Sequence, residues 1–513
     1  MKSRLLPLVT ALALASVMSL PVSAAVTSEE VQSLSDQTKA MKKTLANLQG
    51  QVKSLERQVK HAEKAANKKS KQASQANAKN TLTGKELIRL IQEEREFLPF
   101  DLDVPGQAFV STGPYVGVPF QFAGNDLVVN TPSVNTDVQL LEIRKSILKQ
   151  LQVMRGEIVR EPFYSHLLLS GVLEGSVEYV DNAGSPSTSD IGLTNVSLDA
   201  FIIGPSSWLL GFIELNYVEV SPANDVYGGV SNYRVSNSRL GVSKAFVTFG
   251  DFSKTPFYGS VGQFYVPYGT YSSLMVSSPF TKVLGRTKAR SIALGFQQQQ
   301  VNGFIGSVFI FRGDSHAASV SKINNGGVNV GYKFKGDYLK GKVGASVIGN
   351  LADSGGMQIG TGFQTAEQIV HRVPGYNVRG VLSVGSHVDF IAEYIGASTR
   401  FNPNDMSYNG HGAKPSALDF EAAFSMDLFD SKPSSVAVGY TQSSQALAMG
   451  LPLNRVSLVL NTSWWRNTLQ SLEIRRDREY AASSFASGGG NVVAAGQGGK
   501  VNKAAVASFD YYF

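Results

Sequence analysis

VNVGYKFKGDYLKGKVGASV, residues 328–347, holds two stretches of alternating apolar and polar side chains, joined at Gly336-Asp337. Before the turn, valine, tyrosine and phenylalanine alternate with asparagine, glycine and lysine, and after it leucine and valine alternate with lysine and serine. Successive side chains of a β-strand point to opposite faces of its sheet. Each stretch therefore predicts a strand with one apolar and one polar face, and the pair predicts an antiparallel hairpin.

The same period of two continues from Tyr164 to the C-terminus and predicts about sixteen strands. The predicted strands are 164–180, 192–204, 207–220, 238–250, 256–266, 287–298, 300–312, 326–335, 338–350, 374–384, 386–398, 416–428, 432–443, 454–466, 469–480 and 501–513. Short turns and long loops alternate strictly between them, whereas a soluble β-sandwich would not predict this alternation. Outer-membrane barrels combine short periplasmic turns with long external loops. The predicted fold class is therefore all-β, a transmembrane antiparallel β-barrel spanning residues 164–513.

The chain ends in SFDYYF, residues 508–513, where Phe509, Tyr511 and Phe513 fall on one face of the last predicted strand. Outer-membrane barrels carry aromatic girdles, and their last strand closes the barrel edge. We interpret these three aromatic residues as a barrel closure signal that meets outer-membrane lipid and the barrel assembly machinery.

The N-terminus has the organisation of a secretory signal peptide. Lys2 and Arg4 precede an apolar stretch, Leu5 to Leu20, and small residues then predict cleavage before Ala25, which assigns residues 1–24 to the leader. No later run reaches the roughly 18 apolar residues that a membrane-spanning helix needs. The chain has no cysteine, which suits an exported protein and excludes cysteine-ligated metal and a thiol nucleophile.

Residues 26–60 are predicted to be a periplasmic coiled coil, because residues 31–59 carry a heptad pattern whose helix would reach about 45 Å. Its seam residues are Val31, Thr38, Leu45, Val52 and Val59 at one position, and Leu34, Met41, Leu48 and Leu55 at the other. A coiled coil needs a partner helix, so a homo-oligomer is expected, with a single helix on the periplasmic rim as the alternative. Residues 61–98 follow as a Lys/Ala-rich linker and a short helix, and their positive charge suits contact with the cell wall.

Residues 99–163 are the least barrel-like part of the mature chain, and we predict a periplasmic or plug-like segment. GPYVGVPFQF, residues 113–122, is rich in the glycine and proline that set turns. Asn135 then caps a predicted amphipathic helix. The apolar residues on one face of that helix are Leu140, Ile143, Ile147 and Leu151. The sequence leaves open whether this unit plugs the barrel or lies against its periplasmic mouth.

The net charge of +7 comes from the first 98 residues, because the leader carries two cations and residues 26–98 a surplus of five. Residues 99–513 are neutral, which supports neither a globally basic pore nor a nucleic-acid partner. The polar faces of the strands still give candidate pore-lining residues. These are Lys333, Lys335, Lys340 and Lys342 on one wall, and Asp389, Glu393, Asp419 and Glu421 on another. Segregated charge of this kind would orient polar or anionic solutes, while the simpler interpretation is that it keeps the wall wet.

Nothing in the sequence predicts an enzyme, a cofactor or a metal site. Gly313-Asp314-Ser315-His316 is similar to the GDSL block of some lipases, but it lies in a predicted external loop without the helix that would support a nucleophile. The six histidines show no tight metal-ligand spacing.

Two stretches carry a family resemblance. GPYVGVPFQF at 113–122, followed by TDVQLLEIR at 136–144, resembles the legiobactin-receptor (LbtU-like) siderophore porin family. The order of coiled coil, short segment, barrel and terminal Phe513 extends the resemblance over nearly the whole mature chain. It implies a barrel of about sixteen strands with a periplasmic extension, which takes up ferric siderophore.

Two other functions stay open at this stage. A trimeric anion-type porin, for phosphate or dicarboxylate, similarly joins an N-terminal coiled coil to a barrel, although it would need a ladder of lysine and arginine. A structural tether between the outer membrane and the cell wall would instead use the lysine-rich stalk. A pore should still conduct when residues 26–82 are deleted, whereas a tether loses its role.

Overall fold

The computed structural model describes the sheet that the alternating sequence predicts. The described residues are 100–104, 108–112, 136–144, 165–204, 206, 208–219, 238–300, 302–317, 322–363, 368–428, 432–465, 467–489 and 492–513. They belong to one unit of the chain, Phe97–Phe513. The predicted signal peptide (1–24), coiled coil (26–60) and linker with its short helix (61–98) lie outside the described residues.

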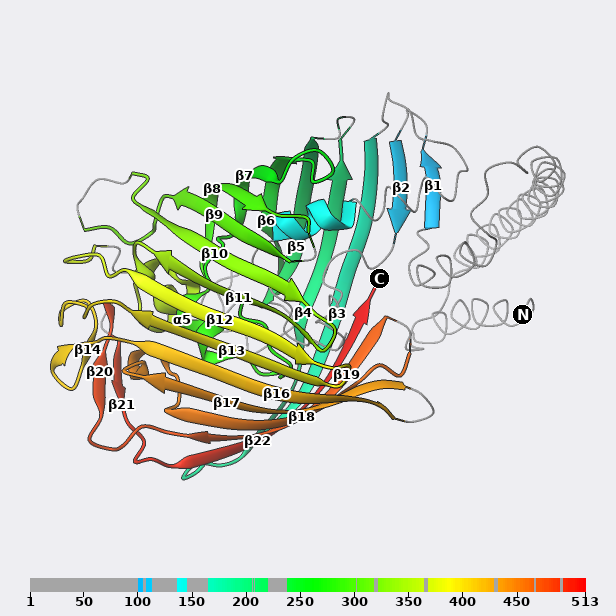
Figure 1. The fold of residues 1–513 in the computed structure, drawn as a ribbon. Helices are drawn as coiled ribbons and strands as arrows, with labels where there is room; N and C mark the ends of the chain where they lie inside the picture. The colour runs from blue at the N-terminus through cyan, green and yellow to red at the C-terminus, as the bar shows by residue number, and fades with distance from the viewer. Residues whose placement is uncertain are drawn as a thin grey trace, which may run out of the picture. The chain divides into compact units, whose positions relative to one another are not determined.

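Sixteen strands wrap into a closed antiparallel barrel (Figure 1). Its strands are β3 (Ser165–Asp181), β4 (Thr188–Ile203), β5 (Leu209–Glu219), β6 (Ser238–Gly250), β7 (Phe257–Tyr265), β8 (Lys288–Gln297), β9 (Gly303–Phe311), β10 (Asn325–Lys335), β11 (Leu339–Ile348), β12 (Gly375–Val384), β13 (Val388–Ala397), β16 (Ser416–Leu428), β17 (Lys432–Ser444), β18 (Asn454–Thr462), β19 (Thr468–Arg478) and β22 (Val501–Tyr512). Each pairs with its neighbours in sequence, and β22 returns to pair with β3 from Lys503↔Asp181 to Tyr512↔Val172. The predicted barrel is confirmed.

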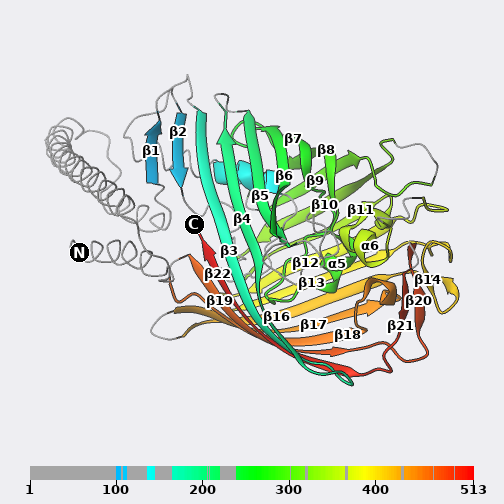
Figure 2. The same cartoon turned by 180° about the vertical axis from the view of Figure 1, so that it is seen from behind.

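Two further strands extend the sheet at its first strand. β1 (Phe100–Val104) pairs with β2 (Ala108–Thr112), and β2 runs parallel to the start of β3 (Figure 2). No helix in the described part of the chain is long and apolar enough to cross a bilayer.

The opening hairpin has the register that its pattern predicts. Val330 of β10 pairs with Ala345 of β11, and Lys333 pairs with Lys342. Because the period of a strand is two, these pairs place the lysines on one face and the valines on the other. The observed strand ends lie within about four residues of the predicted ones.

β9 shows how the barrel sorts its side chains. Phe304, Val308 and Ile310 are 49–62% exposed and form the outer face, while Phe309 and Phe311 on the opposite face are buried. The inner face is therefore apolar here, which is unusual for a wetted barrel wall. Something inside the lumen must cover it.

An apolar band surrounds the barrel, as membrane-spanning barrels require. Exposed members of this band are Leu173, Val177, Val247, Ile292, Leu294, Val328, Val343, Val378, Val438, Leu458 and Ile474. Trp208, Trp464 and Trp465 are exposed beside short turns, and Phe509 and Tyr511 are exposed on β22. Such a belt of aromatic residues suits the border between hydrocarbon and water.

One connection departs from the sequence prediction. Residues 267–286 are predicted from the sequence to form a long external loop, but the connection between β7 and β8, residues 266–287, folds into the barrel (Figures 1 and 2). We call this segment the inward loop. Its short helix α5 (Phe280–Gly285) lies within the ring of strands, and the barrel lumen becomes the candidate site.

Candidate functional site

The inward loop enters the lumen through two residues in left-handed backbone conformations. Gly269 has φ +81° and Tyr271 has φ +59°, which turn the chain from β7 toward the far wall. A Cβ at Gly269 would lie only 2.4 Å from the ring of Tyr271, so the bend needs glycine. Tyr268, Leu274 and the start of α5 are buried beyond it.

Three glutamates on the opposite wall hold the inward loop, and we call them the glutamate clamp. Glu393 on β13 accepts hydrogen bonds from the backbone N–H groups of Thr270 and Tyr271 at 2.9 and 2.6 Å. Glu421 on β16 accepts from the Ser273 hydroxyl at 2.5 Å and from the Leu274 N–H at 2.7 Å.

The third member of the clamp completes the same arrangement. Glu473 on β19 accepts from the N–H and the hydroxyl of Ser277 at 2.8 and 2.5 Å. Asn461 of β18 adds a bond to the Leu274 carbonyl at 2.9 Å. Hydrogen bonds to an ionised group are about twice as strong as neutral ones, so the three carboxylates fix the loop across the lumen.

The acidic residues predicted from the sequence all face the lumen, but loop and wall partners surround them. Asp389, Glu393, Asp419 and Glu421 are each 1–3% exposed. Asp389 accepts a hydrogen bond from Ser383. Asp419 lies directly opposite Glu393 in the β13–β16 register. All four lie on the predicted face and are buried there; Glu393 and Glu421 bind the inward loop, whereas Asp389 binds a serine of the wall.

The predicted lysines lie on the lumen face of β10 and β11. Lys333 pairs across the strands with Lys342, and Lys335 with Lys340. Lys335 is exposed near the short turn, and the other three are half-buried. The two predicted groups are thus on separate walls and do not form one mixed cluster.

The sequence prediction missed a third group, the ion pairs around the rest of the lumen. Lys244 of β6 binds Glu214 of β5 at 2.7 Å, and both side chains are nearly buried. Asp199 interacts electrostatically with both groups. These residues occupy inward positions of the alternating pattern on neighbouring strands. That alternation could have predicted from the sequence that they face the lumen.

Two arginines on β18 and β19 form the other pairs. Arg455 donates to both carboxylate oxygens of Asp477 at 2.7 and 2.8 Å, and its guanidinium lies over the Phe280 ring of the inward loop. Arg475 binds Glu178 of β3 at 2.5 Å. These cations are matched by carboxylates, unlike the lysines of β10 and β11.

The helix at residues 136–144 packs inside the barrel. Asp137 accepts a hydrogen bond from Ser260 of β7 at 2.6 Å, and Arg144 donates to the Gly250 carbonyl of β6 at 3.4 Å. Burial raises the pKa of Asp137, although the bond from Ser260 opposes the shift. These contacts seat helix 136–144 on lumen-facing residues of β6 and β7, while residues 113–135 and 145–163 of the predicted segment lie outside the described residues.

Apolar packing explains why the helix stays there. Its Val138, Leu140 and Leu141 join one buried cluster with lumen-facing aromatic residues. The aromatic members on β4 to β7 are Phe201, Phe212, Phe246, Tyr258 and Phe264. Phe212 and Phe246 lie 5.3 Å apart, and Phe246 and Phe264 5.6 Å. Such burial stabilises by roughly 25 cal/mol per Å² of apolar surface removed from water.

The long loops build a second layer over the other end of the barrel. β14 (Ser407–Tyr408), β15 (His411–Gly412), β20 (Phe485–Ser487) and β21 (Val493–Ala495) form a four-stranded sheet from two different loops. η3 (Leu351–Asp353), α6 (Gly355–Gly360) and η4 (Leu447–Met449) pack beside it. Phe363 and Phe401 lie 5.9 Å apart within this layer.

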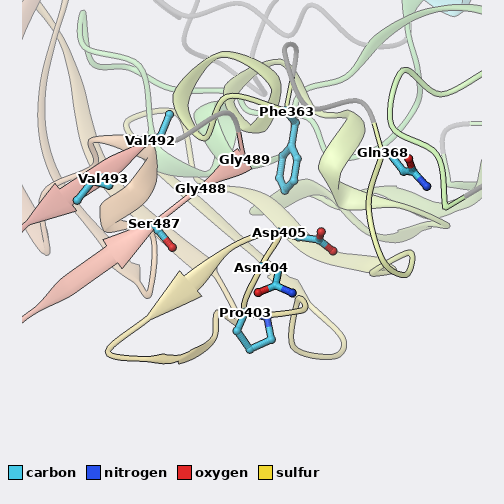
Figure 3. Close-up of a pocket in the computed structure, with 10 residues that line it drawn as sticks. All are labelled: Phe363, Gln368, Pro403, Asn404, Asp405, Ser487, Gly488, Gly489, Val492 and Val493. Atoms are coloured by element: carbon cyan, nitrogen blue, oxygen red, sulfur yellow. The ribbon is translucent and has the colours of Figure 1, made fainter.

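A cavity of about 400 Å³ lies among these loops (Figure 3). Three loops line it, with Phe363 and Gln368 from the first, Asn404 and Asp405 from the second, and Ser487 from the third. Asp405 accepts a hydrogen bond from the Val370 N–H at 2.9 Å, and burial raises the pKa of its carboxyl. The carboxyl therefore ties two loops together.

The GDSL-like motif does not present a nucleophile. Ser315 is fully buried; its N–H donates to Asp353 at 2.7 Å, and its hydroxyl accepts from Gln358 at 2.8 Å. The neighbouring His316 ring lies against the Asp314 carbonyl. Among the described residues, no group of three or more His, Asp and Glu side chains could hold a metal ion.

No family model matches the chain. A UPF0422 protein of Coxiella burnetii is 36% identical to it over 408 residues, covering 79% of this chain and 84% of that protein. The chain belongs to the UPF0422 family. A UPF0422 protein of Legionella pneumophila strain Philadelphia 1 is 34% identical over 391 residues, covering 74% of this chain and 71% of its own length.

Two solved outer-membrane channels are similar to parts of this UPF0422 chain. The anion-selective porin from Comamonas acidovorans covers 68% of the chain and 100% of its own, with 11% identity and a TM-score of 0.46. The outer membrane channel DcaP of Acinetobacter baumannii covers 68% and 97%, with 12% identity and a TM-score of 0.44. These likenesses concern the fold alone.

Proposed function

We propose that this UPF0422 protein is an outer-membrane porin that takes up ferric siderophore. The observation that carries the proposal is the inward loop, held across the lumen of a closed barrel by the glutamate clamp. A barrel of about sixteen strands is wide enough for an aqueous channel unless it is filled. A fixed constriction inside such a barrel would restrict which solutes pass through the channel.

The membrane location is part of this proposal. The apolar outer band and the exposed aromatic residues beside the short turns support an outer-membrane position, with the short turns toward the periplasm. The exposed Phe509 and Tyr511, with the terminal Phe513, support recognition by the barrel assembly machinery. A homo-oligomer joined by the coiled coil, and contact of the stalk with the cell wall, remain proposals from the sequence.

The choice of ferric siderophore rests on the resemblance of residues 113–122 and 136–144. The second stretch forms the lumen helix, where its Asp137 and Arg144 contact the barrel wall. A segment with this position would influence what crosses the barrel. The cavity among the outer loops offers a first point of capture outside the constriction.

We propose transport and not catalysis. The buried Ser315 supports this proposal, since its hydroxyl already bonds to Gln358 and has no access to a substrate. The glutamates bind the inward loop, and the lysines of β10 and β11 form no ion pair with the described residues, which leaves these lysines available to a passing solute.

An anion-type porin for phosphate or dicarboxylate is the second candidate. The lysine pairs on β10 and β11 favour it, because they place four cations on one lumen face. A ferric siderophore that carries carboxylates would use the same cations, so the two candidates differ in solute and not in pathway.

Conductance of the purified full-length protein in a planar bilayer tests the proposal. We expect stepwise channels that are blocked by a ferric hydroxamate or a ferric carboxylate siderophore at micromolar concentration, but not by the iron-free compounds. Block by inorganic phosphate alone would replace the siderophore with the anion-porin function. The absence of any conductance would overturn the pore. Deletion of residues 26–82 is the matched control, since a pore still conducts without them.

A further inference from the structure

We infer that the lumen carries a binding lane for multivalent carboxylate anions along β10, β11 and β12. The lane deepens the proposed function and rests on the existence of the pore. It consists of Lys335 with Lys340, then Lys333 with Lys342, and finally Arg379.

The two lysine pairs form successive rungs. Lys335 pairs with Lys340 next to the short turn, and Lys333 pairs with Lys342 two residues further into the lumen. Two residues of strand span about 7 Å, so the rungs are about 7 Å apart. The register thus stacks four cations along one inner face, from the short-turn mouth toward the inward loop.

Like charges directly opposite each other on neighbouring strands destabilise a sheet. Here the arrangement occurs twice in succession, and within the described ranges none of the four lysines forms an ion pair. Glu142 of the lumen helix is the nearby carboxylate that interacts electrostatically with Lys342, and it also accepts a hydrogen bond from Gln297. A bound anion would relieve this repulsion.

Arg379 of β12 continues the lane. Its guanidinium donates to Asn377 at 2.9 Å and to Ser346 at 3.3 Å, which fixes its direction along the wall. It lies over Gly344 of β11, where a Cβ would come within 3.1 Å of Nη2. Glycine at this position therefore gives the guanidinium its seat, next to the inner lysine rung.

Arg379 also connects the lane to the glutamate clamp. It lies opposite Glu393 in the β12–β13 register. Glu393 accepts hydrogen bonds from Thr270, Tyr271 and Asn377, so its charge is shared with the inward loop. Glu421 and Glu473 are engaged in the same way. Glu393 therefore offsets part of the Arg379 charge at the inner end of the lane, whereas the lysine rungs lie one and two strands further from this carboxylate.

The spacing of the rungs selects the ligand class. A dicarboxylate or tricarboxylate separates its negative groups by several ångströms, so it can contact two rungs at once, whereas acetate or chloride contacts one. Binding to two linked points raises affinity through effective concentration. Inorganic phosphate shares the charge but is too compact to bridge the rungs.

Planar-bilayer recordings with citrate test the lane. We expect wild-type channels to prefer chloride over potassium in a salt gradient, and citrate to block them at lower concentration than acetate or phosphate. Lys333→Gln with Lys342→Gln should raise the half-blocking citrate concentration by about fivefold for each lysine, since each contact is a single charge pair near water.

Lys503→Gln is the matched control, because Lys503 is exposed on the outer face of β22 and its replacement should leave citrate block unchanged.

Two results would overturn the lane but not the pore. The first is a wild-type channel that conducts but prefers potassium over chloride, and the second is equal citrate block of the wild type and the double variant. Stronger block by phosphate than by citrate would also overturn it, because a compact anion would then be the ligand. Absence of conductance would overturn the pore and the lane together. Circular dichroism of each variant checks that the barrel has formed.

Discussion

The two walls of the lumen use charge in opposite ways. On β13, β16 and β19, three glutamates receive six hydrogen bonds from one loop, and every one of these carboxylates is buried. On β10 and β11, four lysines face each other in like-charged pairs, with Lys335 exposed and the other three half-buried. Hydrogen-bonded carboxylates hold the inward loop, whereas these lysines form no ion pair with the described residues.

The largest effect on conductance is expected from removing the hydrogen bonds between the glutamate clamp and the inward loop. The test is to change Glu393, Glu421 and Glu473 together to glutamine. Glutamine replaces one of the two accepting oxygens of each side chain with an NH2 donor, which then faces an N–H or O–H donor of the inward loop. Each lost charge-assisted bond removes about 1.5–3 kcal/mol of loop stability, so the inward loop should leave the wall. Single-channel conductance should rise severalfold while the strands stay paired.

Asp427→Asn provides the control for this triple variant, because Asp427 is an exposed carboxylate on β16 outside the clamp. Its conductance should equal that of the wild type. Unchanged conductance in the triple variant would mean that the glutamates do not hold the constriction.

A second prediction compares a paired lysine with an unpaired one. Lys244→Met leaves Glu214 and Asp199 buried without their cation and should lower the free energy of unfolding by about 3 kcal/mol. Lys342→Gln relieves a like-charge pair and should change it by about 0.5 kcal/mol or less, in the stabilising direction. Guanidinium unfolding in detergent micelles measures both. Equal losses for the two variants would remove the distinction between an ion-paired lysine and a lysine in a like-charged pair.

The smallest expected effect is a pH dependence of selectivity. Burial, with a contribution from the neighbouring Arg286, lowers the pKa of Lys282 in α5 to about 7. As the pH falls from 8 to 6, Lys282 gains its proton and adds a positive charge to the lumen. The chloride-to-potassium permeability ratio should therefore rise on acidification, by less than about twofold for one screened charge.

Lys282→Arg separates this lysine from other titrating groups. Arginine stays charged over the whole range, so the variant should show the acid value at both pH values. A wild-type slope that persists in the arginine variant would assign the pH dependence to another residue.

The sequence predicted the faces of the strands because burial of a strand is a local, periodic property. On β16, Asp419 and Glu421 were placed on the inner face by their alternation with Leu418 and Phe420 alone, and the structure has them there. The lysine rungs follow from the same argument with the turn at Gly336 added. These features need no knowledge of distant residues.

The partners of the inner side chains could not be predicted this way. Ser277 and Glu473 are separated by 196 residues, and no local pattern links a loop serine to a particular strand. The inward course of the loop did leave a trace, because its buried Tyr271, Leu274 and Phe280 are unusually apolar for a loop predicted to face water. Helix 136–144 is a similar case, since the apolar lumen face of β9 requires a cover that only the assembled barrel reveals.

The clamp has a consequence for how the molecule is made. Its three glutamates come 122 to 196 residues after the loop atoms that they bind, and the last of them lies on the strand before β22. Contacts between segments so far apart in the chain form late, because a large loop must close first. A barrel that lacks its final strands therefore cannot yet hold the inward loop, so the constriction of the lumen forms only at the end of assembly.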